Sequence, residues 1–187
     1  MKTRCDWAAG QFEAYIKYHD EEWGVPVHND QTHFEFLVLE GAQAGLSWAT
    51  VLKKRGGYRK AFANFDVKKV ALFNEDKIQE LIHNPDIIRN KLKIRGAVIN
   101  AQRFLDIQEE FGTFDTYIWS FVNHKPIVNR WSKMEDCPAT SPESDALSKD
   151  LKKRGFKFVG STIIYAHMQA CGLVNDHLVS CFRYHEV

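Results

Sequence analysis

Apolar residues in this chain recur at intervals of three and four, which is the spacing of one face of an α-helix. One such segment is "THFEFLVLEGAQAGLSWATVLKKR", residues 32–55. Thr32 and Glu35 stand at capping-box spacing at its start. We therefore predict a helix that begins at Thr32 and carries its apolar residues on to Trp48 and Leu52.

Other segments carry the same pattern, with capping residues or helix breakers at their ends. The helices predicted from it are 67–73 after Asp66, 75–82 after Asn74, 87–111 between "NPD" (84–86) and Gly112, 114–122, 145–154 after Ser144, and 161–172. Segment 114–122 could pass for a strand, but it has no partner strand of similar quality nearby. Residues 123–143 hold three of the five prolines and are predicted to form a loop. The predicted fold is all-α, a bundle of many short helices in a single domain, 1–187.

The composition is that of a folded protein with a sizeable core, since 44% of the 187 residues are hydrophobic and 13% are aromatic. The net charge of +1 excludes a globally polycationic nucleic-acid binder but allows a local basic face. No segment has the apolar length of a signal peptide or a membrane span. We expect an intracellular monomer with no membrane partner and no disulfides. Cys137, in a loop, and Cys171, in an apolar helix, are interpreted as structural.

One cysteine and one histidine stand toward each end of the chain. Cys5 and His19 are separated by thirteen residues, and His177 and Cys181 are four apart, on one face if that segment is helical. Two thiolates and two imidazoles make a closed tetrahedral zinc set, which is structural because no position remains for water. Such a site would hold two termini that otherwise fray. The alternative is buried cysteines beside hydrogen-bonded histidines.

The stretch "LKKRGFKFVGSTIIYAHMQACG", residues 151–172, has the layout of a helix-hairpin-helix. A basic helix ends at Gly155, a tight turn follows, and a new helix opens at Ser161 and Thr162. Gly160 allows close approach of the backbone, and the helix N-terminus offers free amides to a phosphate. The basic residues around it are Lys152, Lys153, Arg154 and Lys157. Residues 52–60 and 89–95 form two more basic clusters, and each of the three could instead be an ordinary solvated helix face.

A single carboxylate interrupts the apolar run from Phe36 to Leu52. On a helix, Glu40, Gln43 and Ser47 form one polar stripe, which could face solvent. The stripe carries no lysine or arginine, unlike most solvated faces. Aromatic residues from other segments could instead surround the acid and form a slot for a flat cationic ligand: Trp7, Tyr18, Trp23 and Trp48.

These stretches together resemble one family, the constitutive (type I) bacterial 3-methyladenine DNA glycosylases of base excision repair. The matching segments span nearly the whole chain in order: "RCDW", "YHDEEWGVP", "LEGAQAGLSWATVLKKR", "WSFVNHKP", "SDALSKDLKKRGFKFVG" and "MQACGLVNDH". The resemblance implies a helix-hairpin-helix glycosylase fold, a bacterial cytoplasmic location, and removal of 3-methyladenine from duplex DNA. It also implies one structural zinc ion per chain that joins the termini, with Cys5, His19, His177 and Cys181 as its ligands.

The resemblance further implies a role for individual residues. Glu40 and Tyr18 would contact the flipped base and Trp48 would stack on it, while Gly45 and Leu46 match the segment that enters the duplex. Many relatives with this hairpin use an aspartate beyond it as catalytic carboxylate, and that role looks absent in this family. It should therefore not be assigned to Asp176.

Relatives that also nick DNA carry a lysine just after the hairpin glycine, where this chain has Ser161 and Thr162. The resemblance therefore implies a monofunctional enzyme whose reaction stops at an abasic site.

A flipping glycosylase needs a wedge, which Leu46 could supply, and a pocket for the extruded base. Methylation at N3 makes adenine cationic and a good leaving group, so Glu40 serves best in recognition, by a charge-assisted contact. The sequence does not decide whether Glu40 also activates water. The alternatives are a non-catalytic, zinc-stapled module that senses lesions, and a zinc hydrolase, for which no "HExxH"-type motif is present.

Overall fold

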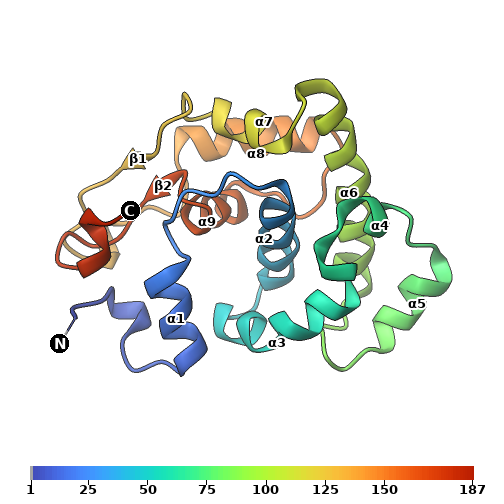
Figure 1. The fold of residues 1–187 in the computed structure, drawn as a ribbon, viewed down its shortest axis with the longest axis horizontal. Helices are drawn as coiled ribbons and strands as arrows, with labels where there is room; N and C mark the ends of the chain where they lie inside the picture. Colours follow the sequence, from blue (N-terminus) through green and yellow to red (C-terminus); the bar gives the residue numbers. More distant parts are fainter. Residues whose placement is uncertain (1) are drawn as a thin grey trace.

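The computed structural model describes residues 2–187, and nearly all of its regular structure is helical (Figure 1). The helices are α1 (Glu13–Glu21), α2 (Asp30–Gln43), α3 (Trp48–Ala61), α4 (Val67–Ala71), α5 (Glu75–His83), α6 (Lys91–Phe111), α7 (Phe114–Ser120), α8 (Pro142–Lys153) and α9 (Ser161–Ala170). Short 3₁₀ turns lie at Asp6–Ala8, Ala63–Phe65, Met134–Asp136 and Phe182–His185. The strands β1 (Ile127–Val128) and β2 (Val174–Asn175) pair in parallel.

Helix α2 is the centre of the molecule, with α3, α6, α7 and α9 packed around it (Figure 1). Every residue from His33 to Ala42 is buried, so this helix has no solvated face. That is why it lacks a strong apolar–polar periodicity. Phe104 of α6 stacks on Phe114 of α7 with ring centroids 4.1 Å apart, and Phe34 of α2 meets Phe104 edge-on.

Side-chain caps begin most of the helices, as the sequence pattern indicated. Asp66 and Asn74 cap α4 and α5 as predicted, and Gly112, at φ +85°, ends α6. Three predicted starts were wrong by two to four residues. The side chains of Asn29, Asn90 and Ser141 cap α2, α6 and α8, so these helices begin at Asp30, Lys91 and Pro142 rather than at Thr32, residue 87 and residue 145.

The predicted run from residue 32 to residue 55 is two helices, not one. Helix α2 ends at Gln43, Gly45 takes φ +78°, and the Ser47 side chain accepts a hydrogen bond from the Thr50 amide to start α3. Glycine accommodates this backbone conformation without steric strain. Ser47 therefore does not continue the stripe of Glu40 and Gln43, and the turn projects Leu46 outward.

The two ends of the chain lie together. The Phe182 amide donates to the Thr3 carbonyl at 2.9 Å, and Cys5 and Cys181 are both buried between the terminal segments. The segment from His177 to Cys181 is not helical, contrary to the helical alternative for that pair, and an irregular backbone brings the two side chains to one point. None of the helices within residues 2–187 combines the length and the apolar character needed to cross a bilayer.

Candidate active site and metal centre

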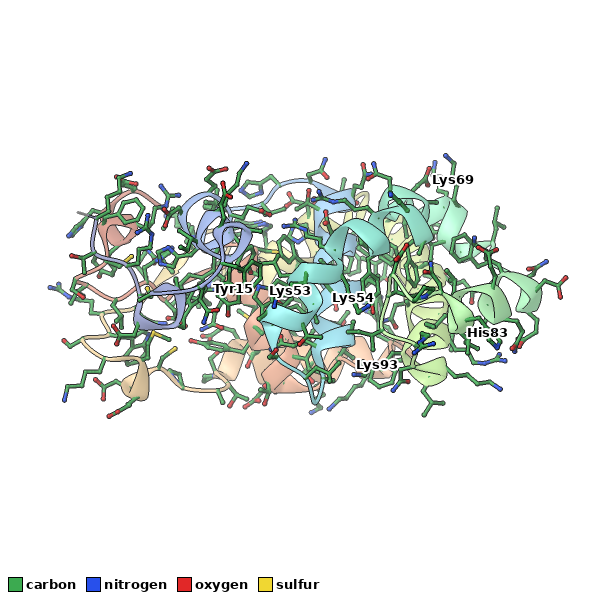
Figure 2. The ribbon with its side chains drawn as sticks, turned by 90° about the horizontal axis from the view of Figure 1, so that it is seen from below. Tyr15, Lys53, Lys54, Lys69, His83 and Lys93 are labelled. Atoms are coloured by element: carbon green, nitrogen blue, oxygen red, sulfur yellow. The ribbon has the colours of Figure 1, made fainter. Side chains whose placement is uncertain are left out.

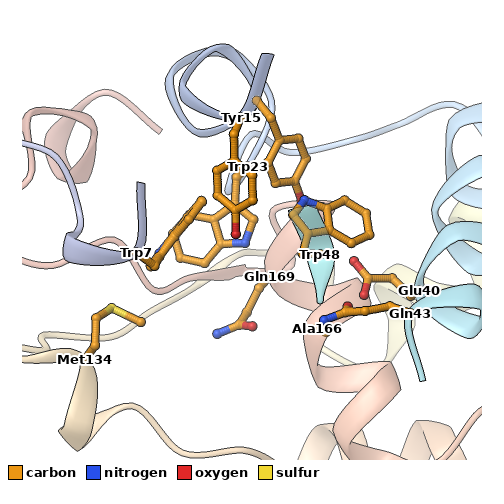
Figure 3. A pocket seen from close by; sticks show the side chains of 10 residues that line it. Trp7, Tyr15, Trp23, Glu40, Gln43, Trp48, Met134, Ala166 and Gln169 are labelled. Atoms are coloured by element: carbon orange, nitrogen blue, oxygen red, sulfur yellow. The ribbon is translucent and has the colours of Figure 1, made fainter. Parts of the chain in front are cut away.

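An aromatic pocket of about 200 Å³ lies between the N-terminal segments and the helices α2 and α9 (Figure 3). The residues that line it are Trp7, Tyr15, Tyr18, Trp23, Glu40, Gln43, Trp48, Met134, Ala166 and Gln169. The acid Glu40 and all four aromatic residues predicted to surround it are among them. Residues from positions 7 to 169 of the chain thus meet in one space, as the interpretation of an acid surrounded by aromatic rings predicted.

Edge-to-face packing fixes the aromatic wall. The ring centroid of Trp7 lies 4.9 Å from that of Trp23 and 5.6 Å from that of Tyr15, both edge-to-face, whereas the Tyr18 ring is tilted by 46° against that of Trp48, with the centroids 5.2 Å apart. Such geometry is favourable for aromatic quadrupoles and holds the rings in place before a ligand arrives. In Figure 3 the polar ends of Glu40 and Gln43 point into the same space as the indole of Trp48.

Glu40 is only 4% exposed, and within residues 2–187 its carboxyl group has no hydrogen-bond partner. Burial alone raises its pKa to about 8, so the free pocket holds this group largely protonated at neutral pH. Another acid of the same helix behaves differently: Glu35 accepts from Arg55 at 2.7 Å and from Arg59 at 3.1 Å. The unpartnered acid is therefore the one that faces the pocket.

A groove of about 340 Å³ adjoins the pocket and shares Glu40, Gln43 and Ala166 with it. The remaining residues of its lining are Ala44, Gly45, Leu46, Thr162 and Ile163. It thus runs from the turn between α2 and α3 to the N-terminus of α9. The acid stands where the pocket and the groove meet.

The turn at the end of α2 presents an exposed apolar side chain on a supported backbone. Leu46 is 43% exposed, and its amide donates to the Gln43 carbonyl. The Lys93 ammonium of α6 donates to the carbonyls of Ala42 and Ala44, two of the groups that a helix C-terminus leaves free. Lys93 therefore has a structural role at this turn, although it belongs to the predicted basic cluster 89–95.

Helices α8 and α9 pack together and are joined by a tight turn, residues 154–160. Gly155 takes φ +92°, and the Asn100 side chain of α6 bonds both the amide and the carbonyl of Lys157. The Ser148 hydroxyl donates to the carbonyl of Val159. The turn is thus held from two helices, with Gly160 as the N-cap of α9.

The residues predicted to bind DNA at this turn differ in their exposure and in the contacts that they already make. Thr162 and Lys157 are exposed, as are Lys152 and Lys153 of α8, whereas Ser161 is half-buried and its hydroxyl contacts that of Ser144. Arg154 is engaged by Asp150 and Glu110. The positive charge free for a ligand is therefore that of the three lysines.

Two basic side chains of the predicted cluster 52–60 also make contacts within the protein. Arg55 lies between Glu22 and Glu35, and the Lys54 ammonium donates to the carbonyl of Pro85. Figure 2 shows Lys53 and Lys54 of α3 on the same face of the molecule as Lys93 and Tyr15. A positive surface remains there, but it has fewer free charges than the sequence suggests.

Cys5, His19, His177 and Cys181 form one buried cluster, which we call the terminal staple. The Sγ of Cys181 lies 3.5 Å from His19 Nε2 and 3.5 Å from His177 Nδ1, and the Sγ of Cys5 lies 3.6 Å from His177 Nδ1. The sulfur and nitrogen ligands of a tetrahedral zinc ion lie about 3.6 Å apart, given bond lengths of about 2.3 and 2.0–2.1 Å. The four donors could therefore hold a metal ion with little movement.

The outward nitrogens of both histidines are already partnered. His19 Nδ1 lies 2.8 Å from a carboxylate oxygen of Asp20, and His177 Nε2 lies 2.9 Å from the Trp23 carbonyl. Such partners fix the tautomer and leave the inner nitrogen unprotonated, as metal ligation requires. Burial lowers the pKa of His177 to about 4 and raises that of Cys5 to about 12 in the metal-free cluster.

The staple also supports the aromatic pocket. The Trp7 ring lies 5.0 Å from His19, and the Trp23 ring lies 4.6 Å from His177. Two of the three pocket tryptophans thus rest directly on staple histidines.

Asp176 is fully buried, and its two oxygens accept five hydrogen bonds. The donors are Asn129, Trp131, Cys137, Tyr165 and Gln169. No lone pair is left free to activate water, which supports the expectation that this aspartate has no catalytic role. Cys137 is structural, as interpreted.

Sequence reasoning missed four residues of the pocket: Tyr15, Met134, Ala166 and Gln169. It noted Gln43 in the polar stripe without assigning it to the site. Tyr15 stands one turn before Tyr18, which was an available signal. Nothing in the local pattern could place Met134, in a 3₁₀ turn far along the chain, in the same pocket as the N-terminal residues.

Comparison with known proteins agrees, over almost the whole chain, with the family that the sequence motifs resemble. Residues 7–184 match the methyladenine glycosylase family. The chain is 50% identical over 181 residues to the DNA-3-methyladenine glycosylase 1 of Escherichia coli (strain K12), which covers 97% of this chain and 96% of that protein. It is also 50% identical over 181 residues to the DNA-3-methyladenine glycosylase of Haemophilus influenzae, with 97% of each covered.

Solved structures agree in fold as well. A crystal structure of a 3-methyladenine DNA glycosylase I superimposes with a TM-score of 0.93 at 48% identity, covering 96% of this chain and 98% of that one. The structure of the 3-methyladenine DNA glycosylase I of Staphylococcus aureus, studied for its recognition of 3-methyladenine, superimposes with a TM-score of 0.92 at 36% identity. The match covers 96% of this chain and 95% of that one. With this extent of similarity and the site geometry above, the chain belongs to the methyladenine glycosylase family.

Proposed function

We propose that this protein is a monofunctional DNA glycosylase that flips 3-methyladenine out of alkylated DNA and hydrolyses its N-glycosidic bond. The observation that carries this proposal is the unpartnered carboxyl group of Glu40 at the junction of an aromatic pocket and a groove. The similarity to glycosylases for this base over nearly the whole chain supports the same reaction.

The proposed recognition uses charge as well as shape. A cation that enters the pocket lies among electron-rich ring faces and beside Glu40, both of which favour positive charge. It therefore favours loss of the Glu40 proton, so that the carboxylate and the base form a charge-assisted contact. Unmethylated adenine is neutral and gains neither effect. Trp48 would stack on the base, with Trp7, Tyr18 and Trp23 as the remaining walls.

The chemistry then requires little acid catalysis. The cationic base departs with the electron pair of the glycosidic bond and becomes neutral, the sugar passes through an oxocarbenium-like state, and water adds to give an abasic site. Glu40 as a carboxylate stabilises the positive charge that moves from base to sugar. A lysine nucleophile would be needed to go on to strand cleavage, and Ser161 and Thr162 occupy the start of α9.

Leu46 is proposed as the wedge that fills the stack after the base leaves. It is exposed, apolar and held at a fixed turn by Gly45 and by the Lys93 contacts, which suits a side chain that enters a duplex. The groove beside it leads to Glu40, which gives the nucleotide a short path from the duplex to the pocket. Leu46→Ala should lower kcat/KM about tenfold or more while free 3-methyladenine still binds, because the pocket is intact.

We propose that helices α8 and α9 with their turn act as a helix-hairpin-helix that holds a backbone phosphate. The amides at the start of α9 and the Lys157 ammonium would be the donors, with Gly160 leaving room for the approach. Lys157→Ala should weaken DNA binding and reduce the slope of log affinity against log salt by about one. Lys68→Ala, on the exposed side of α4, is the matched control and should leave that slope unchanged.

The terminal staple is proposed to hold one structural zinc ion through Cys5, His19, His177 and Cys181. Bound zinc would supply a cross-link between the chain ends and no step of the reaction, because all four ligand positions come from the protein. We expect about one zinc per chain by elemental analysis. Cys181→Ser should lose it and loosen both termini, seen as faster amide exchange there. A chain that is equally protected and metal-free would contradict the staple.

Release of free base separates this function from a non-catalytic lesion sensor. Methylated duplex DNA should yield 3-methyladenine but little 7-methylguanine, and Glu40→Gln should slow this release at least a hundredfold while the fold persists. Glu35→Gln is the matched control, since it changes a buried acid of the same helix outside the pocket. Full activity in Glu40→Gln would reject the role of this residue, and binding without release by the wild type would favour the sensor.

A further inference from the structure

A second cluster of metal-binding side chains lies in the core, separate from the staple and the pocket. His33 of α2, His167 of α9 and Cys171 at the end of α9 are all 0% exposed. One donor atom from each lies within 4.8 Å of the others. His167 and Cys171 are four residues apart, and the Cys171 amide donates to the His167 carbonyl, so α9 presents both on the side that packs against α2.

Three of the four imidazole nitrogens of this cluster lack hydrogen-bond partners. In the described chain, five buried side-chain polar atoms have no partner, and three of them are His33 Nδ1, His167 Nδ1 and His167 Nε2. A buried polar atom without a partner costs about 1–3 kcal/mol, and native structures hold few of them. Three in one place are best explained by a bound species that the nitrogens and the thiol share.

The two histidines do not satisfy each other. Their ring centroids are 5.7 Å apart with planes tilted by 30°, and no hydrogen bond joins them within residues 2–187. Apolar side chains at these positions would fill the core without leaving polar atoms unpartnered.

The outer side of His33 has the partner that metal-bound histidines usually have. Its Nε2 lies 3.4 Å from a carboxylate oxygen of Asp115 on α7, which also lies 3.0 Å from His28 Nδ1. A carboxylate in this position directs the Nε2 proton outward and leaves Nδ1 free for an ion. The Nδ1 atom is the one without a partner.

We propose that His33, His167 and Cys171 form a buried metal site that binds one monovalent copper ion. Soft thiolate and imidazole donors suit Cu⁺, whereas structural zinc is almost always four-coordinate. All three side chains are fully buried, which disfavours a solvent molecule as a fourth ligand. The thiol proton leaves as the ion binds, and the resulting Cu⁺–thiolate pair is neutral, whereas Zn²⁺ would leave a net positive charge in the core.

The test counts copper in the full-length protein. Zinc-loaded wild type and the double variant His33→Leu/His167→Phe are incubated without oxygen with Cu⁺ as its acetonitrile complex, desalted and analysed for both metals. The wild type should retain one equivalent of copper more than the double variant. His28→Ala, which removes a histidine that contacts the same Asp115 from outside the cluster, should retain as much copper as the wild type.

Thermal unfolding gives a second readout that does not depend on counting. Copper should raise the Tm of the wild type and of His28→Ala by about 5–10 °C when free Cu⁺ exceeds its Kd a hundredfold, and leave the double variant unchanged. Without copper the double variant should melt no lower than the wild type, because it lacks the unpartnered nitrogens. Equal copper content in the folded wild type and double variant would overturn the site. An extra zinc equivalent in the wild type, with no extra copper, would overturn its assignment to Cu⁺.

Discussion

Two buried carboxyl groups of this protein have opposite surroundings. Asp176 accepts five hydrogen bonds from side chains of three different segments, whereas Glu40 accepts none within the described chain and faces the pocket. The first is a structural acid, since its hydrogen-bonding capacity is used up inside the protein. The second retains its capacity for a ligand. Burial alone would not distinguish them, since both are at most 4% exposed.

The comparison also shows where the protein accepts a loss of stability for function. An unpartnered buried acid destabilises the native state, and its raised pKa measures this loss. A charged ligand that supplies the missing contact recovers part of it. Polar groups without partners are therefore more informative about ligands than the satisfied ones, and the cluster at His33 and His167 is another such place within residues 2–187.

The largest expected effect is at the satisfied acid. Asp176→Leu leaves the donors Asn129, Trp131, Tyr165 and Gln169 without their acceptor in the core, and should lower the free energy of unfolding by about 5 kcal/mol or more. Urea unfolding at pH 7 measures this. The same replacement at the other acid, Glu40→Leu, should leave that free energy unchanged or raise it. Equal losses in the two variants would mean that the two acids do not differ as described.

A smaller effect depends on pH. The folded-state pKa of Glu40 is raised from 4.5 to about 8, so between these values the native state holds a proton that the unfolded state has lost. Stability therefore falls as pH rises through this window, by about 1.4 kcal/mol per unit, and levels off above pH 8. Glu40→Gln lacks this dependence. Its unfolding free energy relative to the wild type should rise across the window and reach about 3 kcal/mol at pH 7.

Glu35→Gln is the control for this measurement, since Glu35 is buried on the same helix but paired with Arg55 and Arg59. The Glu35→Gln variant should be less stable than the wild type, and its unfolding free energy relative to the wild type should not rise between pH 5 and pH 8. If the difference in unfolding free energy between Glu40→Gln and the wild type did not change with pH, the raised pKa of Glu40 would be contradicted.

The smallest effect concerns the residue that links the two regions. Gln169 donates to Asp176 at 2.8 Å and also lines the pocket. Gln169→Leu removes one of five donors to Asp176 and should lower the free energy of unfolding by about 1–2 kcal/mol. It should change kcat/KM for methylated DNA only a few-fold. A loss of activity as large as that of Glu40→Gln would mean that Gln169 itself contacts the reacting nucleotide.

Local signals predicted most of the helical elements but not α1, and they predicted the ends of the helices less well. Asp66, Asn74 and Gly112 act within one turn of the backbone, so their effects were visible in sequence. The break after Gln43 was missed because Ala44 to Ser47 carry no proline, and Gly45 alone is compatible with a helix. The turn forms where Lys93, fifty residues away along the chain, caps the carbonyls of α2.

The sequence by itself determined the helical class, the acid within an apolar run, the two cysteine–histidine pairs and the family. These follow from residue type and spacing over short distances. Only the tertiary structure decided which acids have partners, which basic side chains are free, and that the two pairs meet at one point. Those outcomes depend on contacts between segments as distant as Trp7 and Gln169, or His33 and His167, and no local pattern encodes where such segments meet.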